Sequence, residues 1–138
     1  MIAQSKNELM LRLKDGEDLV PALIGLDVPS GVILNGVGML RNLKLGFWNG
    51  VEYELESVEE PVELLSLQGN FARKDDGELV VHCHATVAKR GGAAMGGHVL
   101  QATVHNTAEI FIHQLSEIEL KRKTEESGLA GLYPTAIT

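Results

Sequence analysis

The sequence predicts a single α+β domain, built on a mainly antiparallel β-sheet with one principal helix. Many short segments are rich in apolar residues, and several alternate them with polar ones, as strands do. Turn-forming glycine, asparagine and aspartate residues separate these segments at intervals of roughly 8–12 residues, a spacing typical of antiparallel folds. Only one segment, near the N-terminus, has helical periodicity. The length of 138 residues suits one domain over 1–138 that needs no disulfide.

The first two elements are the clearest. Residues 7–14 alternate leucine with polar side chains, which predicts a strand. Residues 17–26 predict a short helix, because acidic residues open it, where they complement the helix dipole, and its leucines fall on one face. Pro29 then ends the helix.

The chain that follows predicts strands separated by glycine-containing turns. The expected strands cover residues 32–40, 43–48, 51–55, 62–71, 79–88, 98–105 and 107–115. Asn49-Gly50 favours a type I′ turn, which predicts a hairpin around it. The glycine-rich segment 89–97 is expected to be a flexible connection, and residues 117–123 either continue the sheet or bend away. The core covers about 8–129, and the tail 130–138 is expected to be loosely ordered.

Composition limits the classes of function. The formal net charge of −7 disfavours autonomous DNA binding, which normally uses a basic face. The run Lys121-Arg122-Lys123 is followed by two glutamates and is expected to be a solvated strand or helix end. The single cysteine, Cys83, excludes an intrachain disulfide and fits a reducing cytosol. No secretory signal or membrane-length apolar run occurs, so we expect a cytoplasmic protein without a membrane anchor.

Some strands are apolar on both faces. Val32–Leu34 and Ile110–Ile112 are examples, and a single helix covers only part of one face. Apolarity on both faces requires cover on both. The simplest cover is another copy of the chain, so the sequence predicts a homo-oligomer.

Three histidines suggest a metal site. His82 and His84 are two residues apart, so in a strand they point to the same face. If His98 arrives on the next strand, three imidazoles can hold Zn²⁺ or another divalent transition metal and leave one position open. The alternative is three ordinary polar residues at a strand end. Cys83 would point to the opposite face, as a small core residue.

The register of the hairpin decides whether the histidines meet. A three-residue loop at 89–91 would set His98 opposite His82. A turn centred on Gly91-Gly92 would instead set His98 opposite Ala85, where a bulge at the preceding glycine pair could restore the cluster.

Four motifs occur in order, and together they resemble the plant-and-prokaryote-conserved (PPC) domain. They are Gly36–Gly46, Leu64–Asn70, His82-Cys83-His84 and Gly96-Gly97-His98. The chain is similar to the free-standing prokaryotic members of this family. The resemblance implies a mainly antiparallel sheet, a trimer whose sheets extend across subunits, and a metal at the matched histidines.

Two departures separate the chain from the plant members. Their Arg-Gly-Arg-Pro hook for the DNA minor groove is absent. Their Gly-Arg-Phe-Glu-Ile-Leu segment, linked to partner recruitment, is replaced by Glu60–Leu65. Neither plant role therefore transfers to this chain.

Other polar residues are candidates for orienting a ligand or supporting the metal: Arg41, Asn42, Glu63, Asn70 and Glu109. Arg41 could instead form a salt bridge across the trimer. Glu109, expected to be buried, would be either a partner of a histidine or part of an interface ion pair. His105 and His113 are expected to be structural or surface residues.

The sequence thus predicts a homotrimeric metal-binding PPC-like module, with a DNA-binding or regulatory role by family analogy. The alternative is a zinc-dependent enzyme that acts on a small polar substrate at His82, His84 and His98. A third interpretation is a structural trimer with an incidental metal. No residue is assigned as catalytic.

Overall fold

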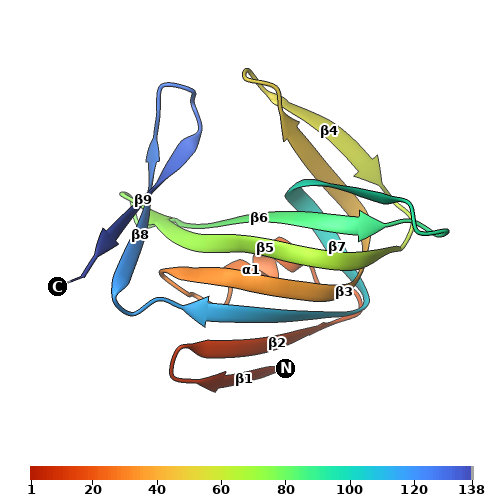
Figure 1. Cartoon of the computed structure of the whole chain (residues 1–138), viewed down its shortest axis with the longest axis horizontal. Coiled ribbons are helices and arrows are strands. Elements are labelled where there is room, and N and C mark those ends of the chain that lie inside the picture. The colour runs from red at the N-terminus through yellow and green to blue at the C-terminus, as the bar shows by residue number, and fades with distance from the viewer. Residues whose placement is uncertain (138) are drawn as a thin grey trace.

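The structure is a computed structural model that describes residues 1–137, and it contains nine strands and one short helix over these residues (Figure 1). The strands are β1 (Ile2–Ser5), β2 (Glu8–Lys14), β3 (Gly31–Trp48), β4 (Tyr53–Val58), β5 (Val62–Lys74), β6 (Leu79–Ala88), β7 (Ala94–Gln114), β8 (Ile118–Thr124) and β9 (Ala130–Ala136). The helix α1 spans Leu19–Ile24. The predicted class, mostly β-sheet with one helix in a single domain, is confirmed.

All strands belong to one sheet, in the order β1-β2-β7-β3-β5-β8-β9. Two strands lie off this path: β4 pairs with β3, and β6 pairs with both β5 and β7. Because β3 also pairs with both β5 and β7, these four strands form a closed ring. Every pairing is antiparallel except that of β5 with β8, which is parallel.

The hydrophobic core lies on the inner face of this ring of strands. Among its largest side chains with almost no exposure are Leu19, Leu23, Ile33, Leu40, Leu43, Leu67, Phe71, Ile110 and Ile112. The helix packs behind the strands, with Leu19 and Leu23 buried (Figure 1). It is shorter than the predicted 17–26, because Asp18 is extended and Asp27 has a positive φ of 52°.

Two pairs of predicted strands are single long strands in the structure. The segments predicted at 32–40 and 43–48 form one strand, β3, which has several register shifts against β7. Asn42 has a φ of 49° at one of these irregularities. The segments predicted at 98–105 and 107–115 likewise merge into β7, where Asn106 has a φ of 63°. A β-bulge interrupts the sequence pattern without ending the strand, and this is why the prediction divided both.

The hairpin between β3 and β4 has a different turn from the predicted one. Trp48 pairs with Tyr53, so the loop contains four residues rather than the two of a type I′ turn. The Asn49 side-chain oxygen accepts hydrogen bonds from the backbone N–H groups of Val51 and Glu52, both at 2.9 Å. This side-chain contact stabilises the wider loop and brings Tyr53 opposite Trp48.

The two ends of the chain are more regular than expected. Residues 2–5 form β1, which the sequence did not predict. Residues 130–136, expected to be loosely ordered, form β9 and pair with β8 over seven residues. The β8–β9 hairpin and the β3–β4 hairpin both project above the other strands in the view of Figure 1.

The outward face of the sheet exposes apolar side chains on four adjacent strands. They are Met10 on β2, Phe111 on β7, Leu34 and Val37 on β3, and Leu65 on β5, each between 37% and 48% exposed. The expectation that both faces carry apolar residues is therefore met, although only the inner face is covered within one chain. Over the described residues, no helix is both long and apolar enough to cross a membrane.

Candidate metal centre

Strand β6 supplies two histidines to one face of the sheet. His82 and His84 point to the same side, and Cys83 between them points into the core with 1% exposure. Burial raises the pKa of the Cys83 thiol to about 12, so the thiol remains protonated. Cys83 is thus a core residue, as expected.

The third histidine comes from β7. His98 pairs directly with His84, and the pairing continues without a shift to Ala88 and Ala94. Both predicted registers are therefore wrong: the one that set His98 opposite His82 by two residues, and the one that set it opposite Ala85 by one. The loop is shorter than the predicted connection 89–97, since only residues 89–93 lie outside strands, and no bulge is needed at Gly96-Gly97.

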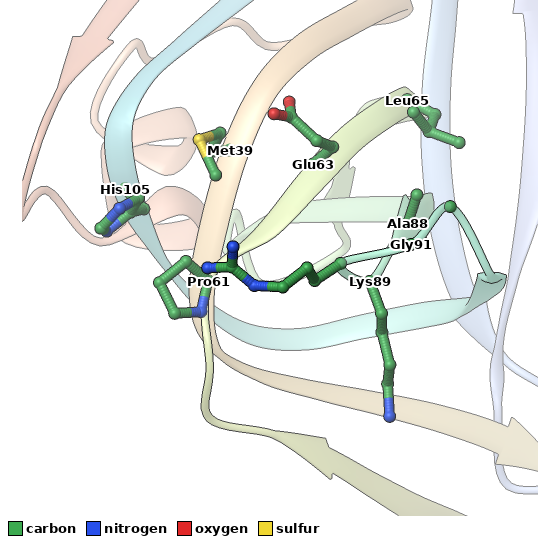
Figure 2. Close-up of a pocket in the computed structure, with 10 residues that line it drawn as sticks. Met39, Pro61, Glu63, Leu65, Ala88, Lys89, Gly91 and His105 are labelled. Carbon is green, nitrogen blue, oxygen red and sulfur yellow. The ribbon is translucent and has the colours of Figure 1, made fainter.

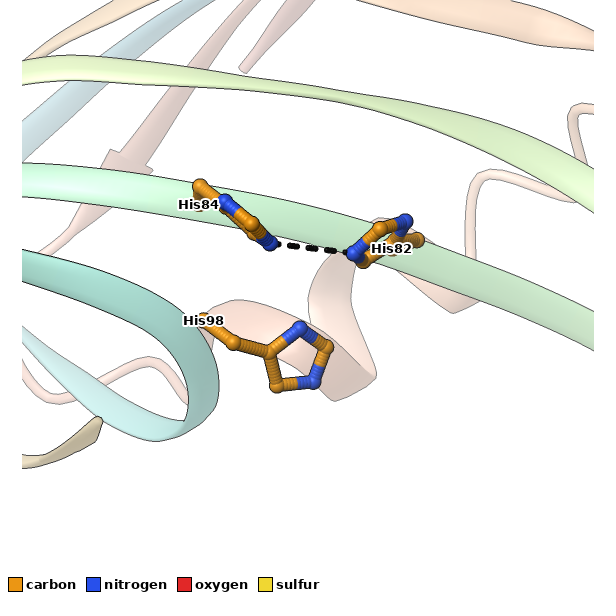
Figure 3. Close-up of side chains that lie close together, drawn as sticks. All are labelled: His82, His84 and His98. Atoms are coloured by element: carbon orange, nitrogen blue, oxygen red, sulfur yellow. Dashed lines mark hydrogen bonds between the residues drawn. The ribbon is translucent and has the colours of Figure 1, made fainter. Parts of the chain in front are cut away.

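The three imidazole rings converge (Figure 3). One ligand-type nitrogen from each ring lies within 4.8 Å of the other two. The Nε2 atoms of His82 and His84 are 3.1 Å apart, and the three ring-centroid distances are 4.9, 5.1 and 5.5 Å. Tetrahedral zinc with Zn–N bonds of 2.0–2.1 Å requires nitrogen atoms roughly 3.3 Å apart. The 3.1 Å separation of the His82 and His84 Nε2 atoms is close to that value.

The surroundings keep two of the rings neutral. Burial lowers the pKa of His82 to about 4, and the nearby Arg122 guanidinium adds to this effect. Burial also lowers the pKa of His98, with a further contribution from His84. Neutral imidazoles offer the lone pairs that a cation needs. In addition, the buried His98 Nδ1 has no hydrogen-bond partner, as expected of a group suited to an ion.

A second layer of side chains lies behind His82. The Arg122 Nη2 donates to Asn70 Oδ1 at 2.6 Å and to His82 Nδ1 at 3.2 Å. Its Nη1 donates to the backbone oxygen of Ala130 at 2.9 Å. Asn70 pairs with His82 across β5 and β6, so the sheet register brings this predicted residue to the cluster.

Arg122 and Tyr53 were not among the predicted site residues. Arg122 is only 7% exposed, although the basic run that contains it was expected to be solvated. Within this basic run, Lys121 and Lys123 are exposed and Arg122 is buried, because alternate residues of β8 point to opposite faces. Tyr53 stacks on His98 with ring centroids 5.0 Å apart, while the ring of Trp48 meets Tyr53 edge-on.

Two cavities adjoin the histidine cluster, and His82 and His98 line both. The first has a volume of about 380 Å³ and includes Arg122 and Glu125 in its walls. The second, of about 400 Å³, is lined by His84 and by aromatic residues of the β3–β4 hairpin.

The remaining predicted residues lie elsewhere. Arg41 donates to Asp15 Oδ1 at 2.7 Å and contacts His105 Nδ1 at 2.9 Å, and Asn42 is at the β3 bulge. Glu63 lines a separate cavity of about 470 Å³ together with His105 (Figure 2). Glu109 is exposed within the protomer, because alternate residues of β7 face outward and 109 is one of them. It therefore does not support a histidine of the cluster from inside the protomer, and its alternative role in an ion pair at a subunit interface stays a prediction.

Comparisons with known proteins agree on the fold. The Plants and Prokaryotes Conserved (PCC) domain matches residues 2–116. The structure resembles that of a plant- and prokaryote-conserved protein from Pyrococcus horikoshii, at 32% identity and a TM-score of 0.83, over 94% of this chain and 92% of the other.

Two further solved structures are similar. One is a metal-containing protein from Archaeoglobus fulgidus (29% identity, TM-score 0.80, 96% of this chain and 95% of the other). The other, from Bacteroides thetaiotaomicron, is described as a "putative dna binding protein" (25% identity, TM-score 0.87, 96% of each chain).

A longer protein also contains a similar segment. The bifunctional protein GlmU of a Synechococcus species is 32% identical over 120 residues. The match covers 83% of this chain but only 18% of that protein, so it concerns one segment of a much larger molecule.

Proposed function

Since the chain belongs to the Plants and Prokaryotes Conserved domain family, we propose that it is a homotrimeric metal-binding module. Zinc, or another divalent transition metal, would be held by His82, His84 and His98. The observation that carries this proposal is the convergence of one nitrogen from each ring within 4.8 Å. The metal-containing relative from Archaeoglobus fulgidus supports it.

The side chains present fit such an ion. Three imidazole nitrogens satisfy three of the four zinc positions, and the unpartnered Nδ1 of His98 gains a role. A zinc ion with an open position can polarise a ligand or lower the pKa of a bound water to about 7. Tyr53 holds the His98 ring by stacking, and Asn70 holds Arg122 behind His82.

Metal content tests the proposal directly. We expect the protein purified without added metal to contain about one zinc per chain by mass spectrometry, as three histidines bind zinc tightly. His84→Ala should lose most of it. His113→Ala is the matched control, because His113 is a strand histidine on β7, as His98 is, but lies outside the cluster. Equal metal in the wild type and His84→Ala would contradict the proposal.

A zinc-dependent enzyme is the second candidate function. The cavity of about 380 Å³ beside His82 and His98 favours it, because Glu125 and Ser127 add polar groups there. We expect zinc-loaded protein to hydrolyse small chromogenic carboxylic or phosphate esters, with loss of turnover in His84→Ala. Turnover that His84→Ala retains would exclude this site as its source.

A DNA-binding or regulatory role rests on analogy with relatives such as the Bacteroides protein. The charge of −7 and the burial of Arg122 oppose a basic face on the protomer. We therefore expect duplex DNA to bind no tighter than about 10⁻⁴ M at physiological salt, the weak end of non-specific binding. Fluorescence anisotropy across a salt series measures this, and tight, steeply salt-dependent binding would restore the analogy.

A further inference from the structure

Arg122 is a buried cation without an anionic partner. The residue is only 7% exposed, yet none of the ion pairs among the described residues includes it. Its hydrogen-bond acceptors are an amide, a backbone carbonyl and an imidazole, all uncharged, and its Nε has no partner. Buried charges are normally paired, so this guanidinium lacks a counter-ion.

The nearest carboxylate in the cavity is already engaged. Glu125 lines the same cavity as Arg122, but its Oε1 accepts a hydrogen bond from the Tyr133 hydroxyl at 3.0 Å. No oxygen of Glu125 lies within salt-bridge distance of Arg122. The counter-ion is therefore missing from the part of the protomer that the structure describes.

The hydrogen bond between Arg122 and His82 links this guanidinium to the cation site. A guanidinium can only donate, so His82 Nδ1 accepts, and a neutral ring then carries its proton on Nε2. That proton fits the 3.1 Å contact with His84 Nε2. If His82 ligates a cation through Nε2, the proton on Nε2 must move to Nδ1, which then has no free lone pair. If His82 ligates through Nδ1 instead, the cation takes the lone pair that accepted the hydrogen bond from Arg122. Either way, a neutral His82 ligand no longer accepts from Arg122.

Cation binding would thus release one N–H of Arg122 and place two like charges close together. Both effects favour a negatively charged ligand between them. The adjoining cavity, about 380 Å³ in volume, has room for a small metabolite. Its walls combine apolar side chains, such as Val80 and Leu129, with the Tyr53 ring.

We propose that this cavity binds a small ligand bearing a carboxylate or phosphate group, one oxygen of which accepts from Arg122 while another takes the open position of the cation. The inference rests on the proposed metal site and deepens it by naming the ligand class. Arg122 lies on β8, beyond residues 2–116, which match the family model.

Calorimetric titrations test the proposal with acetate, inorganic phosphate and neutral acetamide as probes. We expect zinc-loaded wild type to bind acetate or phosphate at least about tenfold more tightly than acetamide, because charge-assisted hydrogen bonds are the strong ones. Removing zinc should weaken this binding about tenfold. Whichever of acetate and phosphate binds more tightly identifies the anionic group of the ligand as a carboxylate or a phosphate.

Arg122→Gln, titrated after it has been saturated with zinc to the same content as wild type, should lose the same factor in anion affinity. Arg90→Gln is the matched control, since Arg90 is exposed in the loop between β6 and β7. If Arg122→Gln has no cooperative unfolding transition, Arg122→Lys replaces it, and we expect an affinity between those of wild type and metal-free protein.

The outcomes separate the two proposals. Zinc-loaded wild type that binds neither anion more tightly than acetamide overturns the ligand proposal and leaves the metal site intact. Unchanged anion affinity in Arg122→Gln or Arg122→Lys also overturns it. A wild type that binds no zinc overturns both.

Discussion

At the scale of single residues, Asn70 supports the Arg122 guanidinium and, through it, His82. Its Oδ1 accepts from Arg122 at 2.6 Å, and hydrogen bonds to charged groups contribute about 1.5–3 kcal/mol. We expect Asn70→Ala to lower the free energy of unfolding by about that amount. Zinc affinity should fall about tenfold, because residues behind a ligand orient it.

Urea unfolding and competition with a zinc chelator measure the two effects. Gln68→Ala is the matched control, since Gln68 is an exposed amide on the same strand with one long contact of 3.5 Å. If the Gln68 and Asn70 variants behave alike, Asn70 has no special role at the cluster.

Asp15 gives the clearest pH dependence. Its Oδ1 accepts from Arg41 and from the Asn106 backbone N–H, both at 2.7 Å, and these bonds hold the pKa of Asp15 below its ordinary 3.8. A lowered folded-state pKa adds stability above pH 3.8 that is lost as the pH falls through the folded value.

The urea midpoints of wild type and Asp15→Asn should therefore differ by a constant amount between about pH 5 and 7. The difference should narrow as the pH falls from about 4 through the lowered folded-state pKa of Asp15, below which the wild-type side chain is uncharged as well. A difference that persists unchanged to pH 2.5 would show that the charge of Asp15 is irrelevant.

Sequence reasoning found the residues whose placement depends on local geometry alone. The two-residue spacing of His82 and His84 is sufficient to place both on one face of β6. Sequence reasoning missed Arg122 because its position depends on which face of β8 is buried. It missed Tyr53 because its position depends on the register of the β3–β4 hairpin. Both are decided by packing between distant parts of the chain, which a local pattern does not record.

At the scale of elements, glycine allows strand β5 to approach the site. A Cβ added at Gly69 would collide with the backbone of His82 and Cys83, so no larger residue fits there without moving β5 away from β6. The sheet at the histidine cluster therefore depends on this close contact.

We expect Gly69→Ala to destabilise the fold by about 1–3 kcal/mol, the usual cost of overpacking. Gly25→Ala is the matched control, because its new Cβ would make only ordinary contacts at 3.4–3.5 Å and its φ is −63°. Chemical denaturation of the two variants compares them. Equal stability of both would contradict a tight β5–β6 contact.

The strands themselves were largely predictable, whereas their continuity was not. Leu79–Ala88 matches the predicted range, since alternation and turn residues mark both ends. Asn42 and Asn106 instead interrupt the pattern within long strands, and both adopt positive φ values that asparagine tolerates. Only the neighbouring strands, which continue to pair across these points, reveal that β3 and β7 do not end there.

At the scale of the whole molecule, ring closure explains why the site forms. The first residues of β7 pair with β6 and its later ones with β3, so this one strand joins both sides of the ring. His98 lies where β7 pairs with both neighbours, opposite His84 on β6 and Gly46 on β3. The cluster is therefore coupled to the folding of the entire sheet, and we infer that cation binding stabilises the fold as a unit.

The outward apolar face favours self-association, for which the family resemblance implies a trimer. Met10 and Phe111 are paired neighbours on β2 and β7, and Leu34 lies on the next strand, so their exposed surfaces adjoin. Exposed apolar patches across several strands are typical of subunit interfaces. We expect multi-angle light scattering to give three times the protomer mass of 14.9 kDa.

Phe111→Lys should shift that mass towards the protomer, because a charge buried in an apolar interface is costly without a partner. Ile24→Lys is the matched control, since Ile24 is 41% exposed on α1, away from the sheet's outward face. A trimer that survives in Phe111→Lys would place the interface elsewhere. A wild type that remains a protomer at micromolar concentration would leave the apolar face without a second copy to cover it, and the homotrimer would be wrong.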